Sequence, residues 1–231
     1  MVGHFTTDSL DSNGNLLPLV ETKNSFSDVS CTAAHMPRLL GLAHASKLFR
    51  NVNSMKDKNL SNDGNEVAWG TIGNASTSEG MFFETLNAAG VLQVPMVVSV
   101  WDDGYGISVD NSHQTVKESI SKAMAGMQRD DNVKGIEIIE VVGWNYAALI
   151  DAYTRASDLA RTEHVPVLVH VTEVTQPLGH STSGSHERYK SNERLEWEKE
   201  YDCNATFRKW IIAQNIASEN ELVAIEEKAA K

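Results

Sequence analysis

The sequence predicts an α/β fold with a mostly parallel sheet that is flanked by helices on both faces. Apolar runs of strand length alternate with segments of helical periodicity through residues 66–174, and this alternation implies right-handed βαβ crossovers. The chain has 231 residues, 41% of them hydrophobic, so it can bury a real core and is most simply one domain with an irregular arm.

The expected elements follow in chain order. Residues 1–30 are rich in Thr, Ser, Asp, Asn and Gly and predict an irregular N-terminal arm. The expected helices and strands are a helix over 33–49, a strand over 66–72, a helix over 77–92, a strand over 95–101, a looser helical region over 113–128, a strand over 134–142, a helix over 145–161 and a strand over 166–174.

The C-terminal part has a different composition. Residues 179–202 are polar, with Gly and Ser first and charged residues after, and predict a long loop followed by a surface helix. Ser218 with Glu221 three residues later predicts a capping box at the start of a final helix.

Composition excludes several classes of protein. The net charge of -11 and pI of about 5.1 argue against binding to nucleic acid or to an anionic membrane surface. The two cysteines form no CxxC pair, so neither a zinc ribbon nor a disulfide framework is indicated, and a cytoplasmic protein is expected. The apolar runs are too short to span a bilayer, and the first residues lack a signal-peptide pattern.

Polar residues follow two of the expected strands. Gly73-Asn74-Ala75-Ser76 ends the first, and Asp102-Asp103-Gly104-Tyr105 ends the second. Since parallel strands present their carboxyl ends at one edge of a sheet, Asn74 and Asp103 are expected to meet there and to offer oxygen ligands for Mg²⁺ or Ca²⁺. Ser76 with Glu79 predicts a second capping box, whose helix N-terminus would suit a phosphate. The alternative is that both stretches are ordinary turns.

The spacing of these two stretches points to a known family. Ser76 to Trp101, 26 residues, separate them, as in the thiamine diphosphate motif, which reads G-D-G, then a span of this length, then N-N. "EGMFFETLNAAGVLQVPMVVSVWDDGYGIS" resembles the cofactor-binding core of the alpha subunit of 2-oxo acid dehydrogenases, and "PLGHSTSGSHERYK" resembles the active-site loop of that family. The resemblance covers roughly residues 25–230 and implies that 31–231 form a thiamine diphosphate-binding domain, part of a longer or fused chain.

The resemblance assigns roles to individual positions. It implies a metal site for Mg²⁺ made of the side chains of Asn74 and Asp103 and the main-chain carbonyl of Tyr105. It also implies cofactor-binding residues that contact thiamine diphosphate, namely Gly73, Asn74, Ala75, Ser76, Asp103, Tyr105, Ile107, His180, Ser30 and Thr32. His180 is the expected catalytic residue, and Ser181 matches a serine that some members phosphorylate.

The implied activity is oxidative decarboxylation of a 2-oxo acid, with a branched-chain acid favoured over pyruvate and transfer of the acyl group to a lipoyl group. The implied partners are a beta subunit or fused beta region, a lipoyl acyltransferase component and a second copy in a homodimer, with no nucleic acid and no membrane. A transketolase-like or acetoin-cleaving enzyme would use the same site. A third hypothesis is a noncatalytic remnant that binds a beta partner.

Three positions depart from the family pattern. Members usually carry Asp at position 74 and Asn at 103, and here the two are exchanged, which keeps their combined charge. Asp102 adds a charge that would repel a diphosphate if it pointed into the site. Of the histidines, His35 is expected to make a structural hydrogen bond, and His170 is expected to be a sheet residue.

Overall fold

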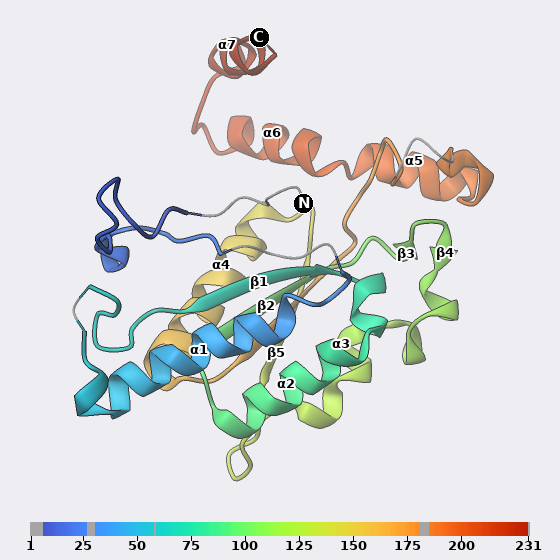
Figure 1. Ribbon diagram of the computed structural model, residues 1–231. Coiled ribbons are helices and arrows are strands. Elements are labelled where there is room, and N and C mark those ends of the chain that lie inside the picture. Colours follow the sequence, from blue (N-terminus) through green and yellow to red (C-terminus); the bar gives the residue numbers. More distant parts are fainter. Residues whose placement is uncertain (1–6, 27–30, 58, 181–184, 231) are drawn as a thin grey trace.

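The computed structural model of the chain describes residues 7–26, 31–57, 59–180 and 185–230, and its arrangement is shown in Figure 1. A four-stranded sheet forms its centre in the order β1-β2-β6-β5. The strands are β1 (Ala68–Gly73), β2 (Met96–Trp101), β5 (Glu137–Val142) and β6 (Val167–Thr172). All three neighbouring pairs are parallel, which confirms the predicted fold class.

The register of the sheet brings the carboxyl ends of three strands together. Gly73 at the end of β1 lies opposite Trp101 at the end of β2, and Trp101 lies opposite Val171 near the end of β6. The segments that leave these strands, residues 74–78, 102–105 and 173–180, therefore start at a common edge.

Helices cover both faces of the sheet (Figure 1). On one face lie α1 (Met36–Asn51), α2 (Gly80–Leu92) and the short α3 (Ile120–Ala123), and on the other lies α4 (Tyr146–Asp158). Because successive strand residues point to opposite faces, Val98 belongs to the first core and its neighbour Val97 to the second. The continuously apolar β2 is thus explained by burial from both sides.

The structure differs from the expected order of elements in three places. The region 113–128 contains only short turns of helix around α3, where Lys117 and Glu118 adopt positive φ angles. A 3₁₀ turn, Ala75–Ser78, precedes α2, because Glu79 is extended and separates the two. A small hairpin of β3 (Tyr105–Gly106) and β4 (Val109–Asp110) follows β2 and was not expected from the sequence.

Three helices follow the sheet: α5 (Asn192–Glu200), α6 (Cys203–Ala213) and α7 (Glu219–Ala229). The helix α6 was missed in the sequence, although Asp202 caps it by accepting a hydrogen bond from the Ala205 N–H. The arm before α1 contains, within residues 7–26, a single bridge between Leu10 and Leu16 and the 3₁₀ turn Leu19–Glu21. In the part of the chain that the structure describes, no helix is both long and apolar enough to cross a membrane.

The predicted capping box of α7 is confirmed, and its energetic contribution can be measured. The Ser218 side chain accepts from the Glu221 N–H, while the Glu221 carboxylate accepts from the Ser218 N–H at 2.8 Å. Ser218→Ala is expected to weaken the helix by about 1 kcal/mol, seen as faster amide hydrogen exchange within residues 219–229. Ser218→Asp, which keeps an acceptor, is the control. Equal exchange in wild type and the alanine variant would contradict the capping role.

Candidate cofactor and cation site

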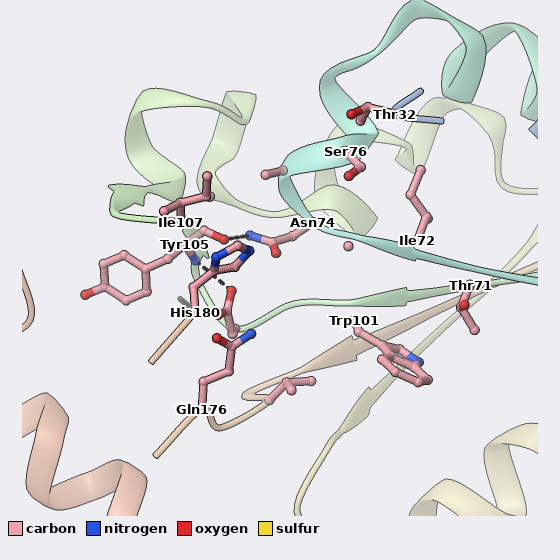
Figure 2. A pocket seen from close by; sticks show the side chains of 15 residues that line it. Thr32, Thr71, Ile72, Asn74, Ser76, Trp101, Tyr105, Ile107, Gln176 and His180 are labelled. Atoms are coloured by element: carbon pink, nitrogen blue, oxygen red, sulfur yellow. Dashed lines mark hydrogen bonds between the residues drawn. The ribbon is translucent and has the colours of Figure 1, made fainter. Parts of the chain in front are cut away.

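A cavity of about 570 Å³ lies at the carboxyl ends of β1, β2 and β6 (Figure 2). This size falls within the range of small-molecule and cofactor sites. The described residues that line it are Thr32, Thr71, Ile72, Gly73, Asn74, Ala75, Ser76, Trp101, Asp103, Tyr105, Gly106, Ile107, Val174, Gln176 and His180.

The structure brings the predicted site residues together. Every one of them that lies in the described part of the chain is in this lining, from Thr32 before α1 to His180 after β6. Ser30 and Ser181 lie outside the described residues. The sequence missed Thr71, Ile72, Trp101, Gly106, Val174 and Gln176. Most of them sit at or just beyond a strand end, so the rule that ligands bind at the carboxyl ends of parallel strands would have found them.

Asn74 is held by both hydrogens of its amide group. Its Nδ2 donates to the Tyr105 carbonyl at 3.0 Å and to Asn111 Oδ1 at 2.8 Å. Figure 2 shows the amide directed toward the Tyr105 main chain. Since both amide hydrogens are engaged, the amide oxygen is the atom left for a ligand in the cavity.

Asp103 supplies the carboxylate of the site. Its Oδ1 accepts from the Tyr105 N–H at 3.0 Å, and its main-chain carbonyl accepts from Arg194 Nη2 at 2.7 Å. Burial raises the pKa of Asp103 above its ordinary value, although the Tyr105 N–H and the Lys190 charge act in the opposite direction. The carboxylate is therefore disfavoured in the folded protein until a positive charge is placed beside it.

Asp102 does not line the cavity. Its Oδ2 lies 2.8 Å from His170 Nε2, and its Oδ1 accepts from Asn111 Nδ2 and the Gly104 N–H, each at 2.9 Å. Burial disfavours the carboxylate, but these hydrogen bonds outweigh burial and hold the pKa of Asp102 below its ordinary value. The Asp102 carboxylate is therefore not directed into the cavity, although its negative charge still acts on the neighbouring Asp103, whose pKa it helps to raise.

The oxygen atoms present suit a hard divalent cation. In the described part of the chain, no group of three or more His, Cys, Asp or Glu side chains could hold a metal ion. The candidate ligands are instead one carboxylate (Asp103), one amide oxygen (Asn74) and one main-chain carbonyl (Tyr105). Mg²⁺ is bound in proteins by few carboxylates together with phosphate and water oxygens, so this donor set fits it.

The capping box predicted from Ser76 and Glu79 is wrong. Asn74 is the residue before the 3₁₀ turn Ala75–Ser78, and the helix that follows begins only at Gly80, with Glu79 as its N-cap. The turn is closed by Thr77 Oγ1, which donates to the Asn74 carbonyl at 2.6 Å. Ser76 still lines the cavity, so its position is as predicted while its capping role is not.

Two histidines that do not line the cavity have the structural roles that the sequence indicated. His35 Nε2 lies 3.0 Å from the Thr71 carbonyl and thus ties the start of α1 to β1. His170 is a fully buried residue of β6. Its contact with Asp102 was not foreseen, because 68 residues separate the two in the sequence.

A buried ion pair holds the start of α5 together, and Arg194 of the same helix contacts the segment that follows β2. Lys190 Nζ lies 2.7 and 2.9 Å from the two carboxylate oxygens of Glu198, and each side chain is only 1% exposed. Arg194 Nε donates to Glu198 Oε1 at 2.8 Å, while its Nη2 donates to the Asp103 carbonyl. The helix expected to be a plain surface helix thus has one buried residue, Glu198, and reaches the candidate site through Arg194.

The fold and the cavity together define an α/β protein with a cofactor-sized cavity, lined in part by oxygen atoms that could hold a cation, at the carboxyl ends of parallel strands. The chain belongs to the family described as "Dehydrogenase E1 component", whose profile matches residues 1–231.

Several curated proteins are similar to this chain over most of its length. It is 28% identical over 210 residues to 2-oxoisovalerate dehydrogenase subunit alpha 1, mitochondrial, of Arabidopsis thaliana, covering 90% of this chain and 40% of that protein. It is 24% identical over 228 residues to pyruvate dehydrogenase E1 component subunit alpha of Rickettsia bellii, covering 98% and 63%. The chain therefore spans less than two thirds of the length of these relatives.

Proposed function

We propose that this chain supplies the cation and diphosphate half of a thiamine diphosphate site in a 2-oxo acid dehydrogenase. The observation that supports this most strongly is the meeting, around one cavity, of residues from four separate segments of the sequence. These are Thr32 before α1, the segments that follow β1 and β2, and His180 after β6. An ordinary pair of strand-end turns gives no reason for Thr32 and His180 to be there.

Each group has a defined part in this proposal. Mg²⁺ would be held by the Asn74 amide oxygen, the Asp103 carboxylate and the Tyr105 carbonyl. Gly73, Ala75 and Ser76 would lie along the diphosphate, and Thr32 and Ile107 would contact the rest of the cofactor. The bound cofactor supplies the carbon nucleophile and electron sink that decarboxylation needs.

His180 is the candidate for the catalytic histidine. It follows β6, its side chain is exposed, and its main chain is hydrogen-bonded to the Tyr189 hydroxyl. We propose that the His180 ring moves a proton or binds an anionic group at the reacting end of the cofactor.

The activity of the whole protein is proposed to be oxidative decarboxylation of a 2-oxo acid with acyl transfer to a lipoyl group. A branched-chain acid is the first choice and pyruvate the second. The names of the relatives include both kinds of dehydrogenase, so they support the class and leave the preference to experiment. The proposed partners are a beta subunit or beta region, a lipoyl acyltransferase component and a second copy of the chain. A cytoplasmic location is part of the same proposal.

Titration calorimetry on the assembled protein tests the site directly. Thiamine diphosphate is expected to bind in the presence of Mg²⁺ and to lose binding when EDTA removes the cation, since the diphosphate and the ligands here are all negative or neutral oxygens. An assay with 2-oxoisovalerate and with pyruvate, using a lipoyl domain as acceptor, then tests the reaction. Absence of cation-dependent binding by the assembled wild-type protein would refute the proposed function.

A further inference from the structure

Asp102 is a buried carboxylate that lies next to the candidate cation ligand Asp103 but is turned away from the cavity. It accepts hydrogen bonds only, as an ionised carboxylate must. One of its oxygens faces His170, and the other faces Asn111 and the Gly104 N–H. Its effect on the site therefore has to pass through one of these neighbours.

The His170 end of this arrangement is fixed. The Ser121 N–H donates to His170 Nδ1 at 3.3 Å, so Nδ1 acts as an acceptor and the ring carries a proton on Nε2. That proton is donated to Asp102 Oδ2 at 2.8 Å. His170 thus holds the carboxylate in place from the side opposite to Asn111.

Asn111 determines which way the Asn74 amide faces at the cavity. Because Asp102 can only accept, the NH₂ group of Asn111 must face it, and Asn111 Oδ1 must then face Asn74. Asn111 Oδ1 in turn requires the NH₂ group of Asn74, which also reaches the Tyr105 carbonyl. Turning the Asn74 amide over would set its oxygen against two acceptors.

We propose that Asp102 is a positioning residue which, through Asn111, fixes the Asn74 amide so that its oxygen rather than its NH₂ group is available to the cation. The inference rests on the proposed function, since it takes Asn74 as a cation ligand. The inference also makes the residues at 74 and 102 depend on each other. The side-chain amide of Asn74 carries an oxygen on one side and an NH₂ group on the other, and the Asp102 carboxylate determines which of the two faces the cavity.

A double-mutant cycle distinguishes this role from a simple effect of charge. Asn74→Asp places a carboxylate against Asn111 Oδ1 and the Tyr105 carbonyl, so it is expected to weaken Mg²⁺-dependent binding of thiamine diphosphate about tenfold, although it adds negative charge beside the cation. Asp102→Asn lets Asn111 and Asn74 turn over, and a similar loss, about tenfold, is expected.

The double variant Asn74→Asp/Asp102→Asn conserves the net charge of the wild type. In it Asn111 can turn over, donate to the new carboxylate at 74 and accept from the new amide at 102, which restores both Asn111 contacts but leaves the Tyr105 carbonyl and the Gly104 N–H without their former partners. Binding is therefore expected to recover in part, so that the double variant binds clearly more tightly than the sum of the two single losses predicts. Asp110→Asn is the matched control, because it removes a charge from the same segment while keeping the acceptor that caps Ser112.

All variants are compared by calorimetry in the assembled protein, with the melting temperature measured in the absence of cation. Stronger binding by Asn74→Asp, or losses that simply add in the double variant, would overturn the inference while leaving the proposed function intact. Failure of the wild type to bind would overturn both. If Asp102→Asn does not fold, the direction of the Asn74→Asp effect alone still decides, because a pure charge effect would strengthen binding.

Discussion

Asp103→Ala is expected to abolish cation-dependent binding of thiamine diphosphate, with a loss of at least about 100-fold in affinity. Asp103 is the only carboxylate among the described residues that line the cavity. Without it, the cation would have an amide and a main-chain carbonyl but no negative protein ligand to balance its charge. Calorimetry with thiamine diphosphate and saturating Mg²⁺ measures the loss.

Asp103→Asn removes the charge of this side chain and keeps its shape, so it shows how much of the binding depends on the charge. The variant keeps an oxygen for the cation and for the Tyr105 N–H, so it should bind more weakly than wild type and more tightly than the alanine variant. Since burial raises the pKa of Asp103, the charged side chain is disfavoured in the cation-free fold, and the neutral variant should unfold at an equal or higher temperature. Exposed Asp151→Ala on α4 is the control. Unchanged binding by Asp103→Ala would remove position 103 from the cation site.

The sequence predicts the sheet and the cavity for the same physical reason. Strands buried on both faces leave continuous apolar runs such as the one around Val98, and their ends mark where polar segments must gather. That is why Asn74 and Asp103 could be placed at one site from the sequence, whereas Tyr105 was assigned by the resemblance to the family. Helical periodicity identified α1, α2 and α4 in the same way, because each packs one apolar face on the sheet.

The orientation of side chains could not be predicted in this way. Asp102 and Asp103 are adjacent in the sequence, and only the packing of β6 against β2 places His170 where it draws Asp102 away from the cavity. The predicted capping role of Ser76 is wrong for a local reason. The capping-box pattern assumes a continuous α-helix, whereas the chain makes a 3₁₀ turn and then an extended residue at Glu79.

The polar composition of residues 190–198 concealed a buried ion pair. From the sequence, Lys190, Arg194 and Glu198 were expected to be solvated charges. In the structure Arg194 and Glu198 lie one turn apart on α5, Lys190 just before the helix also contacts Glu198, and both cations lie over the Tyr105 ring. Burial of such charges is compatible with folding only because each has its partner.

Glu198→Ala is therefore expected to be strongly destabilising, by about 3–5 kcal/mol, since it leaves the Lys190 ammonium buried without its carboxylate. Urea unfolding followed by tryptophan fluorescence suits the measurement, because Trp197 lies on the same helix with the Arg194 guanidinium 4.7 Å from its ring. Glu196→Ala, which removes only an exposed pair with Lys199, should change the free energy of unfolding by less than about 1 kcal/mol. Equal effects of the two variants would contradict the structural role of Glu198.

Replacing both partners separates stability from the arrangement of the site. Lys190→Met/Glu198→Leu removes the two buried charges together, so most of the lost stability should return. Arg194 nevertheless loses the Glu198 carboxylate that orients it, and with it the support for its hydrogen bond to the Asp103 carbonyl. A double variant that is stable yet binds Mg²⁺ and thiamine diphosphate more weakly than wild type would show that α5 acts on the cation site through Arg194. Full recovery of both stability and affinity would limit the ion pair to a role in folding.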